Sequence, residues 1–274
     1  MTLLALAGVV ALGALGGMVG ALLGLGGGVF LVPALTLVYG LPFREAAGVG
    51  LMTVIATSSV VSAQRAGDGT INMRLGIVLE IATTLGGLAG VLTAQTLSQR
   101  TLRLTFGLVA LVIAAVMFRQ INRRDVLPAG DVDDDTGWLG GRFDSPQTGA
   151  SVVYRVKRLP LALITSFFAG NVSGLLGIGG GILKVPVLTS WCGVPLRVAA
   201  TTSSLMIGVT AAASAPLYYA AGEIPALYAA ASVLGVMVGT RAGFWVAERA
   251  RARSLKVLLG LVLVFVAVTM LVRA

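Results

Sequence analysis

Two glycine clusters, GLGGG at residues 24–28 and GIGGG at residues 177–181, interrupt apolar runs of the sequence. Consecutive glycines weaken a helix by about 1 kcal/mol per residue relative to alanine, so we expect a helix to break and restart at each cluster. The first turn of a restarted helix has N–H groups without partners and the positive end of the helix dipole, which together bind anions without a charged side chain. We therefore predict an anion-binding site made by two sets of glycines: Gly26, Gly27 and Gly28, and Gly179, Gly180 and Gly181.

Polar side chains lie close in sequence to the second cluster. Asn171 and Ser173 precede it, and Lys184 follows it by three residues within an apolar run. A lysine inside a membrane span is costly unless it faces a cavity or snorkels to the interface, and we leave both interpretations open. Hydroxyl side chains in each half are candidates for substrate contact, the alternative being hydrogen bonds to the preceding helical turn: Thr57 and Ser58 in the first half, and Thr201, Thr202, Ser203 and Ser204 in the second.

Glu80 is the acidic residue that lies deepest within a long apolar run. Ionisable residues in such a position are rare and often belong to ion or proton pathways. We therefore take Glu80 as the candidate for a carboxylate that couples proton movement to transport, the alternative being a carboxylate at the membrane interface.

Scarce residue types exclude several functions. The sequence has no histidine and a single cysteine, Cys192, so it lacks the commonest metal ligand and any internal disulfide. The acidic run DVDDD at residues 131–135 lacks the ligand spacing of a calcium-binding loop, and we interpret it as part of a solvated linker. We therefore expect no metal, no cofactor and no enzymatic activity.

The composition predicts an all-α integral membrane protein. The chain of 274 residues is 57% hydrophobic and only 11% charged, against about 45–50% and about 25% in soluble domains. The net charge of +9 resides mostly between apolar runs, which indicates contact with lipid headgroups rather than with nucleic acid. The apolar runs predict ten helical segments, at residues 3–23, 28–39, 45–64, 73–97 and 102–118, and at residues 159–176, 182–191, 196–220, 225–247 and 255–272.

The sequence carries an internal duplication. Residues 17–117 align without a gap to residues 170–270 at an offset of 153 residues, and the identical pairs include the glycine clusters and several prolines. We therefore divide the chain into a first transmembrane repeat at 1–118, a polar linker at 119–157 and a second transmembrane repeat at 158–274.

The short segment after each glycine cluster decides the topology. If it crosses the membrane, each half has five crossings and the repeats are inverted; if it re-enters, each half has four and the repeats are parallel. Five crossings put fourteen loop lysines and arginines on one side and four on the other, and cytoplasmic loops are enriched in these residues. We therefore expect inverted repeats with about 8–10 transmembrane segments, in the inner membrane of the cell, with a cytoplasmic central linker.

Several stretches resemble the TauE/SafE family of membrane permeases, the sulfite exporter or 4-toluene sulfonate uptake group. They are GLLGIGGGILKVPVL at residues 174–188, PLRVAATTS at 195–203, LGVMVGTRAG at 234–243 and LKVLLGLVLV at 255–264. The resemblance implies transport of sulfur-containing anions such as sulfite, sulfoacetate or sulfonates. The first half departs from the pattern of the family, because AAGVGLM at residues 46–52 replaces the usual A-x-G-T-S.

These observations predict a secondary transporter of a small anion, namely sulfite, an organosulfonate or a sulfur-containing carboxylate. Duplicated broken helices near the midplane are typical of such transporters, which alternate access by rocking one half against the other. Two alternatives stay open: an anion channel, and a transporter of an unrelated small organic anion. A homodimer is also left open.

Overall fold

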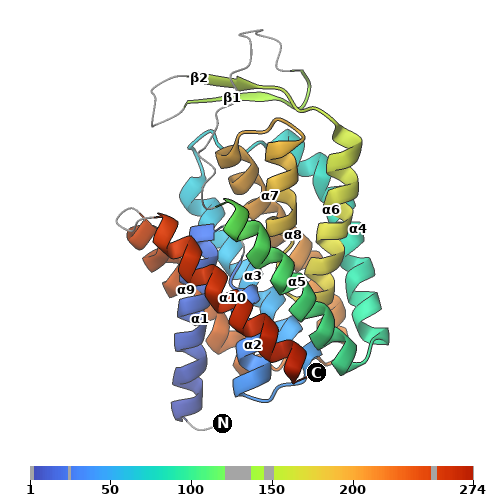
Figure 1. The fold of residues 1–274 in the computed structure, drawn as a ribbon, viewed down its shortest axis with the longest axis vertical. Helices are drawn as coiled ribbons and strands as arrows, with labels where there is room; N and C mark the ends of the chain where they lie inside the picture. Colours follow the sequence, from blue (N-terminus) through green and yellow to red (C-terminus); the bar gives the residue numbers. More distant parts are fainter. Residues whose placement is uncertain (1–2, 24–25, 121–136, 145–150, 248–251, 274) are drawn as a thin grey trace.

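The computed structural model describes residues 3–23, 26–120, 137–144, 151–247 and 252–273, which form ten helices and one pair of strands (Figure 1). The helices of the first half are α1 (Leu3–Leu23), α2 (Gly28–Val38), α3 (Phe43–Arg65), α4 (Met73–Thr96) and α5 (Gln99–Gln120). Those of the second half are α6 (Leu159–Leu176), α7 (Gly181–Ser190), α8 (Leu196–Ala220), α9 (Ala226–Ala247) and α10 (Ala252–Val272). The strands β1 (Gly141–Asp144) and β2 (Ser151–Tyr154) pair antiparallel within the predicted linker, where the sequence analysis expects no strand.

Seven helices are long and apolar enough to cross a membrane, namely α1, α3, α4, α5, α6, α8 and α9. This count, taken over the described residues, confirms the prediction of an all-α integral membrane protein. Helix α2 has 11 residues and α7 has 10. At a rise of 1.5 Å per residue each covers roughly 15 Å, about half of the hydrocarbon thickness. The number of crossings that these short helices add stays a prediction.

The helices of the two halves begin at matching positions. Each of α7, α8, α9 and α10 starts 153 residues after its counterpart among α2, α3, α4 and α5. Three glycine pairs at the same offset have left-handed backbones, with φ of +76° and +75° at Gly26 and Gly179. The other two pairs are Gly40 with Gly193 and Gly69 with Gly222. Because side chains disfavour this conformation, these glycines set the same turns in both halves.

Contacts at the helix ends show that α3 and α8 run in opposite directions. The Asn72 amide N, just before α4, donates to Thr202 Oγ1 at the start of α8 at 3.0 Å. Arg44, at the start of α3, instead donates to the carbonyl of Ala94 at the end of α4, and lies 3.7 Å from Glu223, which follows α8. This matched pair of helices is antiparallel, as an inverted arrangement requires. In Figure 1 the strands lie at one end of the bundle, and both chain ends lie at the other.

The strand pair packs against the end of the bundle where α4 and α8 begin. The Asn72 side chain caps α4 by accepting from the Leu75 amide, and donates to the Leu139 carbonyl and the Tyr154 hydroxyl, both at 2.8 Å. Burial raises the pKa of Tyr154, so this phenol stays neutral. Tyr154 also belongs to a hydrophobic cluster with residues of α4, α6, α7 and α8, including Leu75. Part of the predicted linker is therefore attached to the helices beneath it.

Candidate anion-binding site

The two glycine clusters meet inside the bundle. We call residues 26–28 the first knot and residues 179–181 the second knot; residues 24 and 25 lie outside the described residues. All six glycines are buried. A methyl group on Gly28 would overlap the carbonyl oxygen of Gly177, so the backbone just before the second knot touches the first. A methyl group on Gly26 would contact Val54 of α3 and Ile207 of α8. The start of α2 therefore lies between α3 and α8, against the backbone that precedes the second knot.

The amide groups of the two knots have different partners. Neither α2 nor α7 has a side-chain N-cap. In the first knot, the Gly27 N–H donates to Thr57 Oγ1 at 3.3 Å, and Thr57 donates in turn to the Thr53 carbonyl at 2.8 Å. The residue that matches Thr57 in the second half is Thr210, whose hydroxyl donates to Glu80 Oε1 at 2.6 Å. Among the described side chains, none accepts from the Gly180 N–H.

Lys184 lies in the first turn of α7 with a relative exposure of 1%. Its Nζ has no hydrogen-bond partner among the described residues, and no described carboxylate lies within the 4.0 Å of an ion pair. It interacts electrostatically with Glu80 of α4 across a longer distance. The side chain therefore does not reach the surface of the bundle. An unpaired buried ammonium is costly, so Lys184 is the side chain here whose position most needs an explanation.

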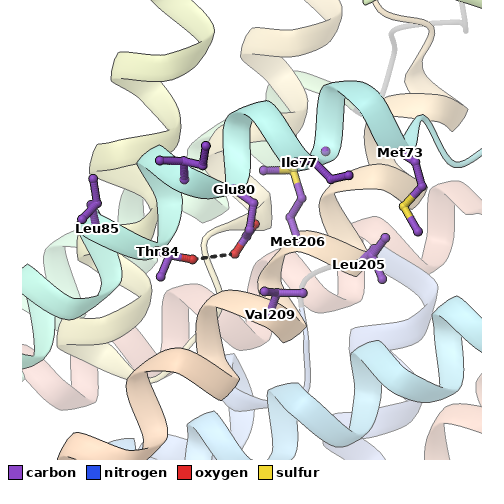
Figure 2. A pocket seen from close by; sticks show the side chains of 10 residues that line it. Met73, Ile77, Glu80, Thr84, Leu85, Leu205, Met206 and Val209 are labelled. Atoms are coloured by element: carbon purple, nitrogen blue, oxygen red, sulfur yellow. Dashed lines mark hydrogen bonds between the residues drawn. The ribbon is translucent and has the colours of Figure 1, made fainter.

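Glu80 lies between Lys184 and a groove on the outer face of the bundle. Its Oε1 accepts from Thr84 at 3.1 Å and from Thr210 at 2.6 Å, while its Oε2 is buried without a partner. Figure 2 shows Glu80 pointing from α4 toward α8, with Thr84 beside it. The groove has a volume of about 600 Å³, and its other lining side chains are mainly apolar: Met73, Ile77, Ile81, Leu85, Leu205, Met206 and Val209.

Most of the predicted hydroxyl ligands have partners within the protein. Thr201 donates to the Thr70 carbonyl at 2.7 Å, and Thr202 accepts from the Asn72 amide. The Ser204 hydroxyl donates to the carbonyl one turn earlier, and Ser58 donates to the Ser204 carbonyl at 2.6 Å. Ser203 alone among these six hydroxyls is buried without a partner. The structure thus brings Lys184 and the knots together, while Thr201 and Thr202 join helix ends.

Two residues near the site were missed from the sequence. Thr210 and Thr84 both donate to Glu80, yet neither is among the hydroxyl residues predicted as ligands. The signal that could have found Thr210 is the duplication, because Thr210 is the identical counterpart of Thr57.

Asn171 is half-buried, and its backbone packs against Gly86 and Gly90 of α4. The described residues contain no group of three or more His, Cys, Asp or Glu side chains placed to hold a metal ion.

Known proteins resemble this chain over most of its length. The family model described as "Sulfite exporter TauE/SafE" matches residues 9–270. The chain is 24% identical over 265 residues to the probable membrane transporter protein YunE of Bacillus subtilis (strain 168), and the alignment covers 94% of each chain. It is 37% identical over 78 residues to sulfite exporter TauE/SafE family protein 6 of Arabidopsis thaliana, covering 28% of this chain and 18% of the relative. No solved structure matches it significantly.

The family match and the seven apolar helices both indicate a membrane protein. A family model that spans nearly the whole chain includes both halves and both knots. The chain is therefore a multi-pass membrane protein that belongs to the sulfite exporter TauE/SafE family of membrane transporters.

Proposed function

We propose that this protein is a secondary transporter of a small sulfur-containing anion, sulfite or an organosulfonate. The observation that carries the proposal is the buried Lys184 ammonium, which has no protein partner and follows the second knot by three residues. Helix N-termini and an ammonium supply only hydrogen-bond donors and positive charge. Sulfite and sulfonates present only acceptor oxygens and negative charge, so they match this donor set.

The paired short helices support a mechanism of alternating access. In secondary transporters with inverted repeats, broken helices hold the substrate near the midplane, and one half rocks against the other. Here the anion lies at the contact between the knots, with access alternating between the two ends of the bundle. The central linker lies on the cytoplasmic side of the inner membrane in this proposal.

Glu80 is the proposed coupling group. Its Oε2 is buried without a partner and can take up a proton, and Lys184 is the charged side chain that interacts with it. Glu80→Gln keeps an acceptor oxygen for Thr84 and Thr210 but cannot carry a proton. We expect this variant to take up anion while losing the accompanying proton movement, measured with a pH-sensitive dye trapped in proteoliposomes. Proton movement at the wild-type rate in Glu80→Gln would remove Glu80 from the coupling pathway.

The transport proposal is tested by uptake of ³⁵S-labelled sulfite and methanesulfonate into proteoliposomes that contain the full chain. We expect uptake that saturates with anion concentration. An anion channel, the competing function, would instead give a conductance that rises without saturation. Absence of any flux of either anion above protein-free vesicles would contradict the proposed substrate class.

A further inference from the structure

The two knots differ in the side chains that surround them, and the duplication shows where. At the offset of 153 residues, three positions differ in polarity between the halves. Gly20, Leu31 and Glu80 of the first half correspond to Ser173, Lys184 and Val233 of the second. We infer that only the second knot binds the anion directly, and that Glu80 is a positioning residue that holds Thr210 away from the Gly180 N–H so that the anion can reach it. This inference rests on the proposed anion transport and narrows its site to one knot.

Ser173 supplies a hydroxyl at the second knot where the first half has none. A methyl group on Gly20 would lie 2.8 Å from the Gly27 amide nitrogen, so position 20 of α1 touches the first knot. The same helix face touches the second knot, because a methyl group on Gly180 would overlap the Ala169 carbonyl of α6, one turn before Ser173. The Ser173 hydroxyl has a relative exposure of 1% and no partner among the described residues.

In the first knot, a threonine of the same half accepts the hydrogen bond that an anion would otherwise accept. Thr57 Oγ1 accepts from the Gly27 N–H at 3.3 Å, and the same hydroxyl donates its proton to the Thr53 carbonyl at 2.8 Å. Thr210 has the equivalent carbonyl, that of Met206, at 3.1 Å. Its only proton is nevertheless directed to Glu80 at the shorter distance of 2.6 Å. The Thr210 oxygen thus lies farther from its own helix carbonyl than the Thr57 oxygen does, at 3.1 Å against 2.8 Å. In this inference the short hydrogen bond to Glu80 draws the Thr210 oxygen toward α4, so that it does not accept from the Gly180 N–H.

Electrostatics alone would not place a carboxylate here. Glu80 interacts with Lys184, and a negative charge near an anion site repels the anion. The matching residue of the first half, Val233, is apolar. A carboxylate at position 80 favours anion binding in this inference because its hydrogen bond with Thr210 leaves the Gly180 N–H free to donate to the anion.

The decisive experiment compares variants of equal charge. Dissociation constants of sulfite, methanesulfonate and sulfate are measured by isothermal titration with the full chain in detergent. Glu80→Gln keeps the acceptor for Thr210, whereas Glu80→Val frees Thr210 to cap Gly180 as Thr57 caps Gly27. We expect Glu80→Val to bind about tenfold more weakly than Glu80→Gln, in proportion to the loss of one charge-assisted hydrogen bond. Adding Thr210→Val to Glu80→Val should restore the affinity of Glu80→Gln to within about threefold.

Two results would overturn the role of Glu80. Equal affinities of Glu80→Gln and Glu80→Val would show that the hydrogen bond between position 80 and Thr210 does not affect anion binding. A double variant as weak as Glu80→Val would show that Thr210 is not the group that blocks the knot. Restoration by the second substitution also shows that Glu80→Val folds, and gel filtration of each variant supports this.

Ser173 is tested by its own matched pair. Ser173→Gly recreates the residue of the first half, and we expect it to weaken anion binding about tenfold. Ser232→Ala is the control, because Ser232 is also a fully buried serine without a hydrogen-bond partner, but lies on α9. An equal, small effect of the two substitutions would remove Ser173 from the site.

These binding measurements separate the inference from the proposed function. A wild-type chain that binds the oxyanions but does not move them in vesicles would overturn the transport proposal and leave the site standing. Flux with unchanged affinity in Ser173→Gly and in the Glu80 variants would overturn the site and leave transport standing. Wild-type protein that binds none of the three anions would contradict both.

Discussion

The first and second knots have similar backbone conformations but differ in whether a side chain accepts a hydrogen bond from their amide groups. Gly26 and Gly179 have nearly the same φ, and each knot starts a helix of 10 or 11 residues. The first knot, however, has its Gly27 amide bonded to a threonine and is surrounded by apolar and glycine residues. The second has an open amide at Gly180 and an unpaired buried Lys184.

This difference shows how a duplicated element can keep its shape while only one copy keeps free binding groups. A helix start offers the same amide donors wherever it occurs, but those donors bind a ligand only if no side chain of the protein occupies them. The hydroxyl of Thr57 accepts from one of these amides, that of Gly27, in the first knot, and the Thr210 hydroxyl donates to Glu80 in the second half. Selectivity for the anion is therefore expected to depend on the second half.

The largest expected effect comes from adding one methyl group to each knot. Gly27 and Gly180 both have negative φ, so alanine is tolerated by the backbone at both positions. A methyl group on Gly180 would overlap the Ala169 carbonyl, whereas one on Gly27 would find its nearest atom, Val236 Cγ2, at 3.2 Å. We expect Gly180→Ala to reduce the initial rate of sulfite uptake at least about 100-fold, since α6 and α7 must separate.

Gly27→Ala is the matched control, and we expect its uptake to stay within about threefold of wild type. Amounts of inserted protein are compared by quantitative blotting of the vesicles. Equal losses in both variants would mean that the two knots are functionally equivalent, and would contradict direct binding at the second knot alone.

Lys184→Leu tests the charge that distinguishes the second half, because it installs the residue of the first half, Leu31. We expect the KM for sulfite uptake to rise about 10- to 100-fold through loss of a charged donor. Replacing an unpaired buried ammonium by an apolar side chain should at the same time raise the melting temperature by about 2–4 °C. A structural role for Lys184 would instead lower the melting temperature, so fluorimetry separates the two.

The helices could be predicted from the sequence because apolar runs and glycine or proline boundaries are local signals. The predicted bounds of α1, α6 and α8 agree with the structure, and α4 differs by one residue at its end. The strands β1 and β2 could not be predicted, since four-residue strands carry little pattern. They depend on contacts far along the chain, such as that of Tyr154 with Asn72.

Candidate residues for the proposed site could be selected from the sequence only where residue type alone is informative. A lysine or a run of glycines in an apolar segment is unusual whatever surrounds it, and so the knots and Lys184 could be identified from the sequence. Which hydroxyls are free cannot be identified in this way. Thr201 and Thr202 have acceptors and donors about 130 residues away, at Thr70 and Asn72, which only the fold brings close.

The two matched arginines give a smaller effect, on stability. Arg44 donates to the carbonyls of Ala94, Gln95 and Leu97 at the end of α4 at 2.7–3.0 Å. Its counterpart Arg197 is exposed. We expect Arg44→Ala to lower the free energy of unfolding by about 1–2 kcal/mol, or roughly 3–6 °C in melting temperature, because the last carbonyls of α4 lose their donors. Arg197→Ala should change it by less than about 1 °C, and similar losses in the two variants would contradict this assignment.

The smallest effect is expected from Thr201, the first hydroxyl of the run in the second half. Its hydroxyl donates to the Thr70 carbonyl. At the offset of 153 residues, Gly48 corresponds to Thr201 and Glu223 to Thr70. These two residues are also in contact, because a methyl group on Gly48 would lie 2.5 Å from the Glu223 carbonyl oxygen. Both halves thus use this position to join helix ends. Thr201→Val should lower the free energy of unfolding by about 1 kcal/mol and leave the KM for sulfite within about twofold. A KM that rises as much as in Lys184→Leu would instead make Thr201 a substrate ligand, and would extend the binding site of the second half from the knot to the start of α8.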